Sequence, residues 1–192
     1  PGDGTPYVLT ARHCQNGDPN GGSPGAAGNI SVYWNAVAAC GQPLGEIYDP
    51  GIPRQFGATT LVEQQDAWLV RLNEEPVVND AYFAGWDATG GTFVGGFTPH
   101  HALGTKRQFT GWFGQASYHV VPGTTLGVHF ESTLWATVNA VGNNSAGSSG
   151  SGLFDANGRL QGVVVRGVRA SGEQDAGVCP SASPPAPSLQ TS

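Results

Sequence analysis

The chain has 192 residues, including 30 glycines and 14 prolines, which excludes a long-helix or coiled-coil protein. Charged residues make up 11% and hydrophobic residues 39%, a balance that fits one folded domain and excludes intrinsic disorder. The formal net charge of −6, with Lys106 as the single lysine, argues against a basic face for nucleic acid.

Targeting and redox signals are sparse. There is no apolar run of 18 residues, so we expect no ordinary membrane-spanning helix. The opening PGDGTPYVLT does not resemble a signal peptide, which suggests either a mature or truncated product or a cytosolic protein. The three cysteines, Cys14, Cys40 and Cys179, permit one pair with one left over, or three free thiols.

Short apolar runs bounded by turn residues predict an all-β sandwich or barrel with few, short helices. In chain order, the predicted strands cover 6–10, 30–37, 67–72, 108–113 and 126–138. Glycine-, serine- and asparagine-rich loops are expected at 15–28, 87–96 and 141–152. Asn157 and Gly158 predict a tight hairpin turn in which both residues take positive φ angles. Residues 180–192 are rich in proline and serine and are expected to form a disordered tail or linker.

Three segments could together supply nucleophilic acyl transfer, which needs a hydroxyl, a base, an orienting carboxylate and backbone donors. TARHC places His13 at a strand end, QQDAWLV places Asp66 before a strand, and GSSGSG places Ser149 between glycines. Each segment also has an ordinary structural interpretation: a surface histidine, a capping aspartate and a flexible loop. Their joint occurrence favours the chemical interpretation.

The same residues carry a resemblance to trypsin-like serine proteases. TARHC resembles their Thr-Ala-x-His-Cys signature, the Asp66 segment their Asp-x-x-Leu-x-x-Leu segment, and GSSGSGL their nucleophile loop. The chain is most similar to the bacterial lysyl endopeptidase branch, through the motifs VYWN at 32–35 and FAGWD at 83–87 and through His100, His101, Lys106 and Arg107. The likeness runs over about residues 6–167.

This resemblance implies a chymotrypsin-like fold of two packed six-stranded antiparallel Greek-key β-barrels, incomplete at both ends, over residues 1–179. It implies a secreted or periplasmic bacterial endopeptidase that acts as a monomer on polypeptides, without metal, cofactor, nucleic acid or membrane. His13 is the expected general base, Asp66 its orienting carboxylate and Ser149 the nucleophile, with Gly147 and Ser149 as oxyanion-hole donors.

Several further expectations follow from the resemblance. Cys14 and Cys40 are expected to form a disulfide, which leaves Cys179 as the partner of an N-terminal cysteine that this chain does not contain. Ser148 stands where mammalian trypsins have an acid that binds a new N-terminal ammonium, so activation is expected not to need that ion pair.

The specificity pocket departs from the lysyl endopeptidase pattern. No acid follows Cys179, and Arg166 with Gly167 replaces a histidine-containing segment of the pocket. Arg166 would repel a cationic substrate side chain, so an acidic or neutral preference is conceivable. Tyr118 is a loose substitute for the family's stacking tryptophan, and Glu173 and Asp175 are more simply interpreted as solvated loop acids.

Two other function classes remain open. One is a catalytically inactive or truncated protease homologue that acts as a binding module. The other is a zinc-binding β domain, because the chain contains His100, His101, His119 and His129. Their spacings match no recognised ligand pair, so polar surface or loop roles are the expected ones.

Overall fold

The computed structural model describes residues 3–15, 27–39, 41–64, 66–89, 93–120, 128–131, 140–141 and 146–164. Within these ranges the chain forms antiparallel β-sheets joined by loops and three short 3₁₀ turns, so the all-β prediction is confirmed. No helix in the described part of the chain is long and apolar enough to span a membrane. Several sites of the sequence predictions lie outside these ranges: Cys40, Cys179, Arg166, Gly167, Glu173, Asp175 and the tail 180–192.

The first sheet is three-stranded and contains the apolar core of the N-terminal half. Its order is β1 (Tyr7–Ala11), β5 (Ala67–Leu72) and β4 (Ala58–Gln64), all antiparallel. In β5 every second side chain faces inward, so Trp68, Val70 and Leu72 are buried together against Ala58. A two-stranded sheet of β2 (Ser31–Tyr33) and β3 (Arg54–Phe56) lies beside this core and packs Val32 against it.

The second sheet contains the C-terminal half. Its strands follow the order β11 (Leu160–Val163), β10 (Gly152–Asp155), β6 (Phe93–His100), β7 (Gln108–Val120) and β8 (Val128–Glu131), with β9 (Ala140–Val141) also paired to β7. One face of this sheet carries Phe97 stacked between Phe109 and Phe154. Thr98 and His100 are fully buried instead, because alternate residues of β6 point to opposite faces.

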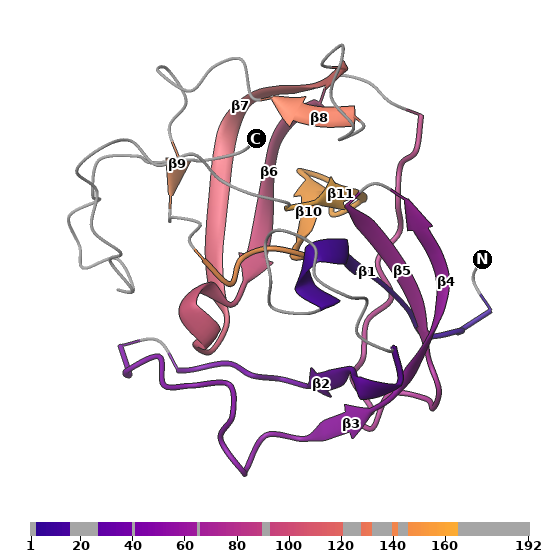
Figure 1. Ribbon diagram of the computed structural model, residues 1–192. Coiled ribbons are helices and arrows are strands. Elements are labelled where there is room, and N and C mark those ends of the chain that lie inside the picture. The colour runs from indigo at the N-terminus through magenta and orange to yellow at the C-terminus, as the bar shows by residue number, and fades with distance from the viewer. Residues whose placement is uncertain are drawn as a thin grey trace.

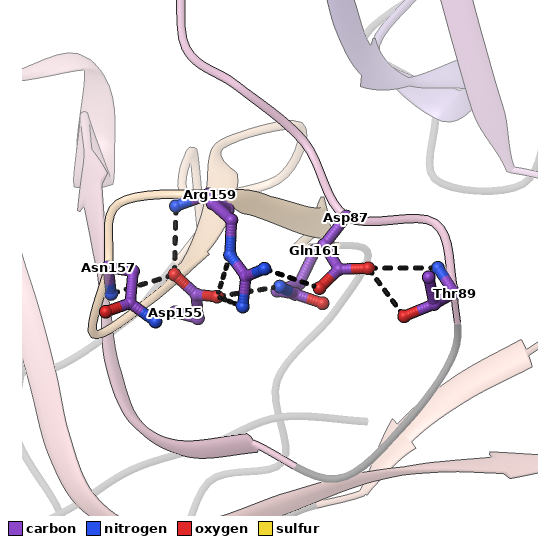
Figure 2. Close-up of polar contacts among 6 residues, drawn as sticks. All are labelled: Asp87, Thr89, Asp155, Asn157, Arg159 and Gln161. Atoms are coloured by element: carbon purple, nitrogen blue, oxygen red, sulfur yellow. Dashed lines mark hydrogen bonds and ion pairs between the residues drawn. The ribbon is translucent and has the colours of Figure 1, made fainter.

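The hairpin between β10 and β11 lies where the Asn-Gly pair predicts it, but its conformation differs from the prediction. Gly158 has φ +75°, whereas Asn157 is not among the residues with positive φ. The reason is Asp155, whose Oδ1 accepts hydrogen bonds from the backbone N–H groups of Asn157 and Arg159 at 2.9 Å each (Figure 2). These two hydrogen bonds close a turn that is longer than the predicted one. In it a single residue, rather than two, has the left-handed conformation.

Most predicted strands are found, two of them at their predicted length and others shorter or longer. The strand predicted at 67–72 is β5, and the one at 6–10 is β1 shifted by one residue. The strand predicted at 30–37 shrinks to three residues in β2, and the one at 108–113 extends to thirteen residues in β7. Among the described strands the sheets are open, so two closed barrels remain a prediction.

Candidate functional site

Strand pairing brings His13 and Asp66 together although they are far apart in the sequence. β1 and β5 are antiparallel with Ala11 opposite Ala67, so the end of β1 lies beside the start of β5. His13 follows β1 in the 3₁₀ turn η1 (Arg12–Gln15), and Asp66 directly precedes β5. The backbone N–H of Arg12 donates to the carbonyl of Asp66 at 2.7 Å, which joins the two segments just beyond the last strand pair.

The carboxylate of Asp66 fixes the orientation of the His13 imidazole. Oδ2 of Asp66 lies 2.7 Å from Nδ1 of His13, and Oδ1 accepts the backbone N–H of His13 at 2.8 Å. A carboxylate only accepts hydrogen bonds, so Nδ1 carries the proton and Nε2 of the neutral ring is left with a lone pair. The side chains of His13 and Asp66 are only 20% and 16% exposed, which strengthens their interaction.

The loop that contains Ser149 packs against this histidine turn. The Cys14 thiol, one residue after His13, lies 3.7 Å from the carbonyl oxygen of Ser149. Gly150 approaches β1 so closely that an added Cβ would overlap with Oγ1 of Thr10. In Figure 1 the orange segment that leads into β10 runs beside the indigo turn η1, between the two larger sheets. The structure therefore brings Ser149, His13 and Asp66 to one region.

Glycine conformations shape the loop from 146 to 152. Gly147 and Gly150 have φ angles of +90° and +81°, in the left-handed region that side chains disfavour. Gly147 also lies against the backbone of residues 101–103, where an added Cβ would be 2.9 Å from the His101 carbonyl oxygen. These contacts hold the backbone on both sides of Ser148. The roles of Gly147 and Ser149 as oxyanion donors remain predictions.

Buried residues behind the loop are a feature that sequence reasoning missed. His100, expected to be a surface or loop residue, is at the end of β6 with no exposed surface, and its Nδ1 lies 2.9 Å from Oγ of Ser148. That expectation was wrong because the polar His-His pattern does not indicate a contact with Ser148, which lies 48 residues later. Only the alternation of β6, which buries Thr98 and then His100, could have suggested an inward-facing histidine.

The cysteine prediction is not met in the structure. Cys14 is a free cysteine, and its Sγ contacts the Ser149 carbonyl rather than a second sulfur. Cys40, its predicted partner, lies outside the described residues. Burial raises the pKa of the Cys14 thiol, and the neighbouring Asp66 carboxylate raises it further. The thiol form is therefore favoured, and a thiol can donate to the carbonyl oxygen.

The structure also places the other histidine and tyrosine candidates within its described ranges. Tyr118 lies on β7 opposite Phe130 of β8, and His119 lies opposite His129 in the same ladder. Nδ1 of His101 donates a hydrogen bond to the carbonyl oxygen of Thr105 at 2.9 Å. No group of three or more His, Cys, Asp or Glu side chains within the described ranges could hold a metal ion.

Comparison with known proteins places the chain in a protease-related family. The sequence matches the family described as "Lysyl endopeptidase, C-terminal domain" over residues 1–178, which is nearly the whole chain. No curated protein matches the sequence. The family match agrees with the lysyl endopeptidase resemblance that the sequence motifs predicted. The chain belongs to the lysyl endopeptidase C-terminal domain family.

Proposed function

We propose that this protein is a serine endopeptidase that hydrolyses peptide bonds through an acyl-enzyme intermediate. The observation that carries the proposal is the pair of hydrogen bonds from His13 to Asp66, at 2.7 and 2.8 Å, next to the loop that contains Ser149. In this proposal His13 is the general base, Asp66 orients it, and Ser149 is the nucleophile. The domain is proposed to have the trypsin-like arrangement of two barrels.

The proposed reaction begins when Oγ of Ser149 bonds to the carbonyl carbon of the substrate and its proton moves to Nε2 of His13. The carbonyl oxygen becomes an oxyanion, which the backbone N–H groups of Gly147 and Ser149 stabilise. Collapse of this intermediate breaks the C–N bond, and the leaving amine takes the proton from Nε2. In the second half, the oxygen of water bonds to the acyl carbon while Nε2 of His13 takes one of its protons. The ester bond between the acyl carbon and Oγ of Ser149 then breaks, Oγ takes the proton back from Nε2, and the carboxylic acid product leaves. Throughout, Asp66 keeps the ring oriented and stabilises the imidazolium.

The substrate in this proposal is a polypeptide, and the setting is extracellular or periplasmic, where the family's proteases act on proteins. Arg166 stands at a pocket position of the lysyl endopeptidase pattern, which supports a preference for acidic or neutral rather than cationic side chains. The protein is proposed to act as a monomer.

Cleavage of a mixed peptide library by the purified protein tests this function and its specificity together. We expect wild type to release fragments with a shared side-chain preference, and Ser149→Ala to release none because the nucleophilic oxygen is gone. Thr89→Ala is a suitable control, because it changes a hydroxyl in an exposed turn whose partner is Asp87. Equal cleavage by wild type and Ser149→Ala would refute the assignment of Ser149.

A second candidate function is a non-catalytic binding module. The family description names a C-terminal domain, and a module appended to a protease is one role that such a domain can have. In that case the peptide library would remain uncut by wild type, while unmodified peptides would bind with equal affinity to wild type and Ser149→Ala.

A further inference from the structure

A buried hydrogen-bonded chain lies directly behind the nucleophile loop. Oγ of Ser148 lies 2.9 Å from Nδ1 of His100, and Nε2 of His100 lies 3.1 Å from Oγ1 of Thr110. Ser148, His100 and Thr110 are 1%, 0% and 0% exposed. The three residues come from the loop, β6 and β7. Their hydrogen bonds therefore connect the loop to the two central strands of the second sheet.

This environment suits a neutral imidazole. A neutral ring has one donor and one acceptor nitrogen, and each hydroxyl can donate or accept, so both tautomers satisfy both contacts. The two side chains that contact the His100 ring, those of Ser148 and Thr110, are both uncharged. Burial, and to a smaller extent the charge of neighbouring His101, together lower the pKa of His100 to about 4.

The position of Ser148 in the loop gives this contact its significance. Ser148 stands between Gly147 and Ser149, the two residues proposed to supply the oxyanion-hole N–H groups. Gly147 is a glycine at φ +90°, so its own peptide planes have wide conformational freedom. A side chain fixed between the two donors therefore restricts the directions of both N–H groups.

We infer that Ser148 and His100 are positioning residues, whose buried hydrogen bond to one another holds the Gly147 and Ser149 N–H groups in the orientation that stabilises the oxyanion. This inference rests on the proposed function. In the proposed reaction neither side chain touches the reacting atoms. Ser148 acts through the backbone, and His100 acts through Ser148. His100 stays neutral in this role, because a charge buried among hydroxyl groups is costly.

Two variants compared side by side distinguish a positioning role of the Ser148 hydroxyl from a contribution to stability alone. Ser148→Ala and Thr110→Val each delete one hydroxyl that contacts His100, and both sites are fully buried. We expect both to lower Tm by a similar amount. Only Ser148→Ala frees the loop, so we expect its kcat to fall about tenfold with KM nearly unchanged, because loss of a whole oxyanion donor costs a hundredfold or more. Thr110→Val should keep kcat within about twofold of wild type.

Hydrogen exchange gives a measurement that does not depend on catalysis. In Ser148→Ala we expect faster exchange at the amides of residues 146–151 than in Thr110→Val or wild type. If wild type cleaves nothing but this difference appears, the proposed function fails while the anchoring of the loop is supported. Equal exchange and equal kcat in the two variants would overturn the inference.

A measurement on wild type covers the case in which Ser148→Ala fails to fold. Nitrogen NMR of the His100 ring should report a neutral imidazole at pH 6, where an exposed histidine is largely protonated. A protonated His100 ring at that pH would contradict a neutral anchor.

Discussion

The carboxylate of Asp66 accepts two hydrogen bonds from the single residue His13, one on each oxygen. Oδ1 accepts the His13 backbone N–H at 2.8 Å, and Oδ2 accepts the ring Nδ1–H at 2.7 Å. The first contact fixes the chain direction in η1, and the second fixes the ring and its tautomer. One side chain therefore determines both where the imidazole lies and which nitrogen faces outward with a lone pair.

Replacing Asp66 with Asn should reverse the tautomer of His13. The amide oxygen of Asn can still accept the backbone N–H, so its NH₂ group is left facing Nδ1 and donates to it. The proton then moves to Nε2, which can no longer act as a base. We expect nitrogen NMR to show the exchanged tautomer, and proposed peptidase activity to fall by about four orders of magnitude. An unchanged tautomer in Asp66→Asn would contradict this account of the pair.

Gly150 and Gly158 form a matched pair for testing the close approach of the loop to β1. Both have positive φ, so alanine at either site incurs backbone strain of about 1 kcal/mol. A Cβ added at Gly158 would have nothing within 4 Å, whereas one added at Gly150 would overlap with Oγ1 of Thr10. We expect Gly150→Ala to lower the free energy of unfolding by about 3 kcal/mol or more. Urea denaturation of both variants measures the difference, and equal losses would show that the loop does not pack on β1.

Asp155 should make stability depend on pH in the acid range. Burial alone would raise the pKa of Asp155, but hydrogen bonds from Arg159 and Asn157 outweigh it and hold the pKa below its usual value (Figure 2). Because the folded-state pKa is lowered, its stabilising effect is present above the unfolded-state pKa near 4 and is lost as pH falls through the folded value.

Substitution of Asp155 tests this dependence. We expect Asp155→Asn to lower the free energy of unfolding by about 2 kcal/mol at pH 7, since a buried carboxylate with several donors is lost. The difference from wild type should stay level above pH 5 and shrink below pH 4. Asp87→Asn, which alters the more exposed partner of Arg159, should have a smaller effect. A difference that grows on acidification would show the opposite pKa shift.

Leu103 has a strained backbone beside the loop that contains Ser149. Its φ is +56°, rare for a bulky residue, and its N–H donates to the Ala146 carbonyl at 2.6 Å. Leu103 is 56% exposed, so little packing is lost when its side chain is removed. We expect Leu103→Gly to keep or raise Tm, because relief of about 1 kcal/mol of strain offsets the added chain freedom. Leu61→Gly, at an exposed site in β4, should lower Tm instead; similar losses in both variants would refute the strain at Leu103.

The sequence predicts local elements better than the contacts between them. The alternation of Trp68, Val70 and Leu72 is sufficient to locate β5 to the residue. The middle of β7 contains glycine, alanine and serine, which have weak strand propensity, and it extends because β6 and β8 pair with it on either side. Such pairing is a tertiary effect that a local pattern does not contain.

In the candidate site, too, the sequence predicts the residues better than the contacts between them. Motifs single out His13, Asp66 and Ser149, but the contact between His13 and Asp66 depends on the register of β1 against β5. The burial of His100 could not be predicted from the neighbouring residues, because its partner Ser148 lies in a loop far away in the sequence. The Asn-Gly pair marks the β10–β11 turn, whereas the conformation of that turn depends on the Asp155 side chain.

Covalent labelling with a fluorophosphonate tests the central claim most directly, because such a reagent modifies a serine rapidly only where a neighbouring base activates it. The account predicts that wild type gains one label, mapped by peptide mass spectrometry to Ser149, and that labelling is lost in Ser149→Ala and strongly slowed in Asp66→Asn. Folded wild-type protein that remains unlabelled, or a label that maps to another residue, would contradict the assignment of Ser149 as an activated nucleophile.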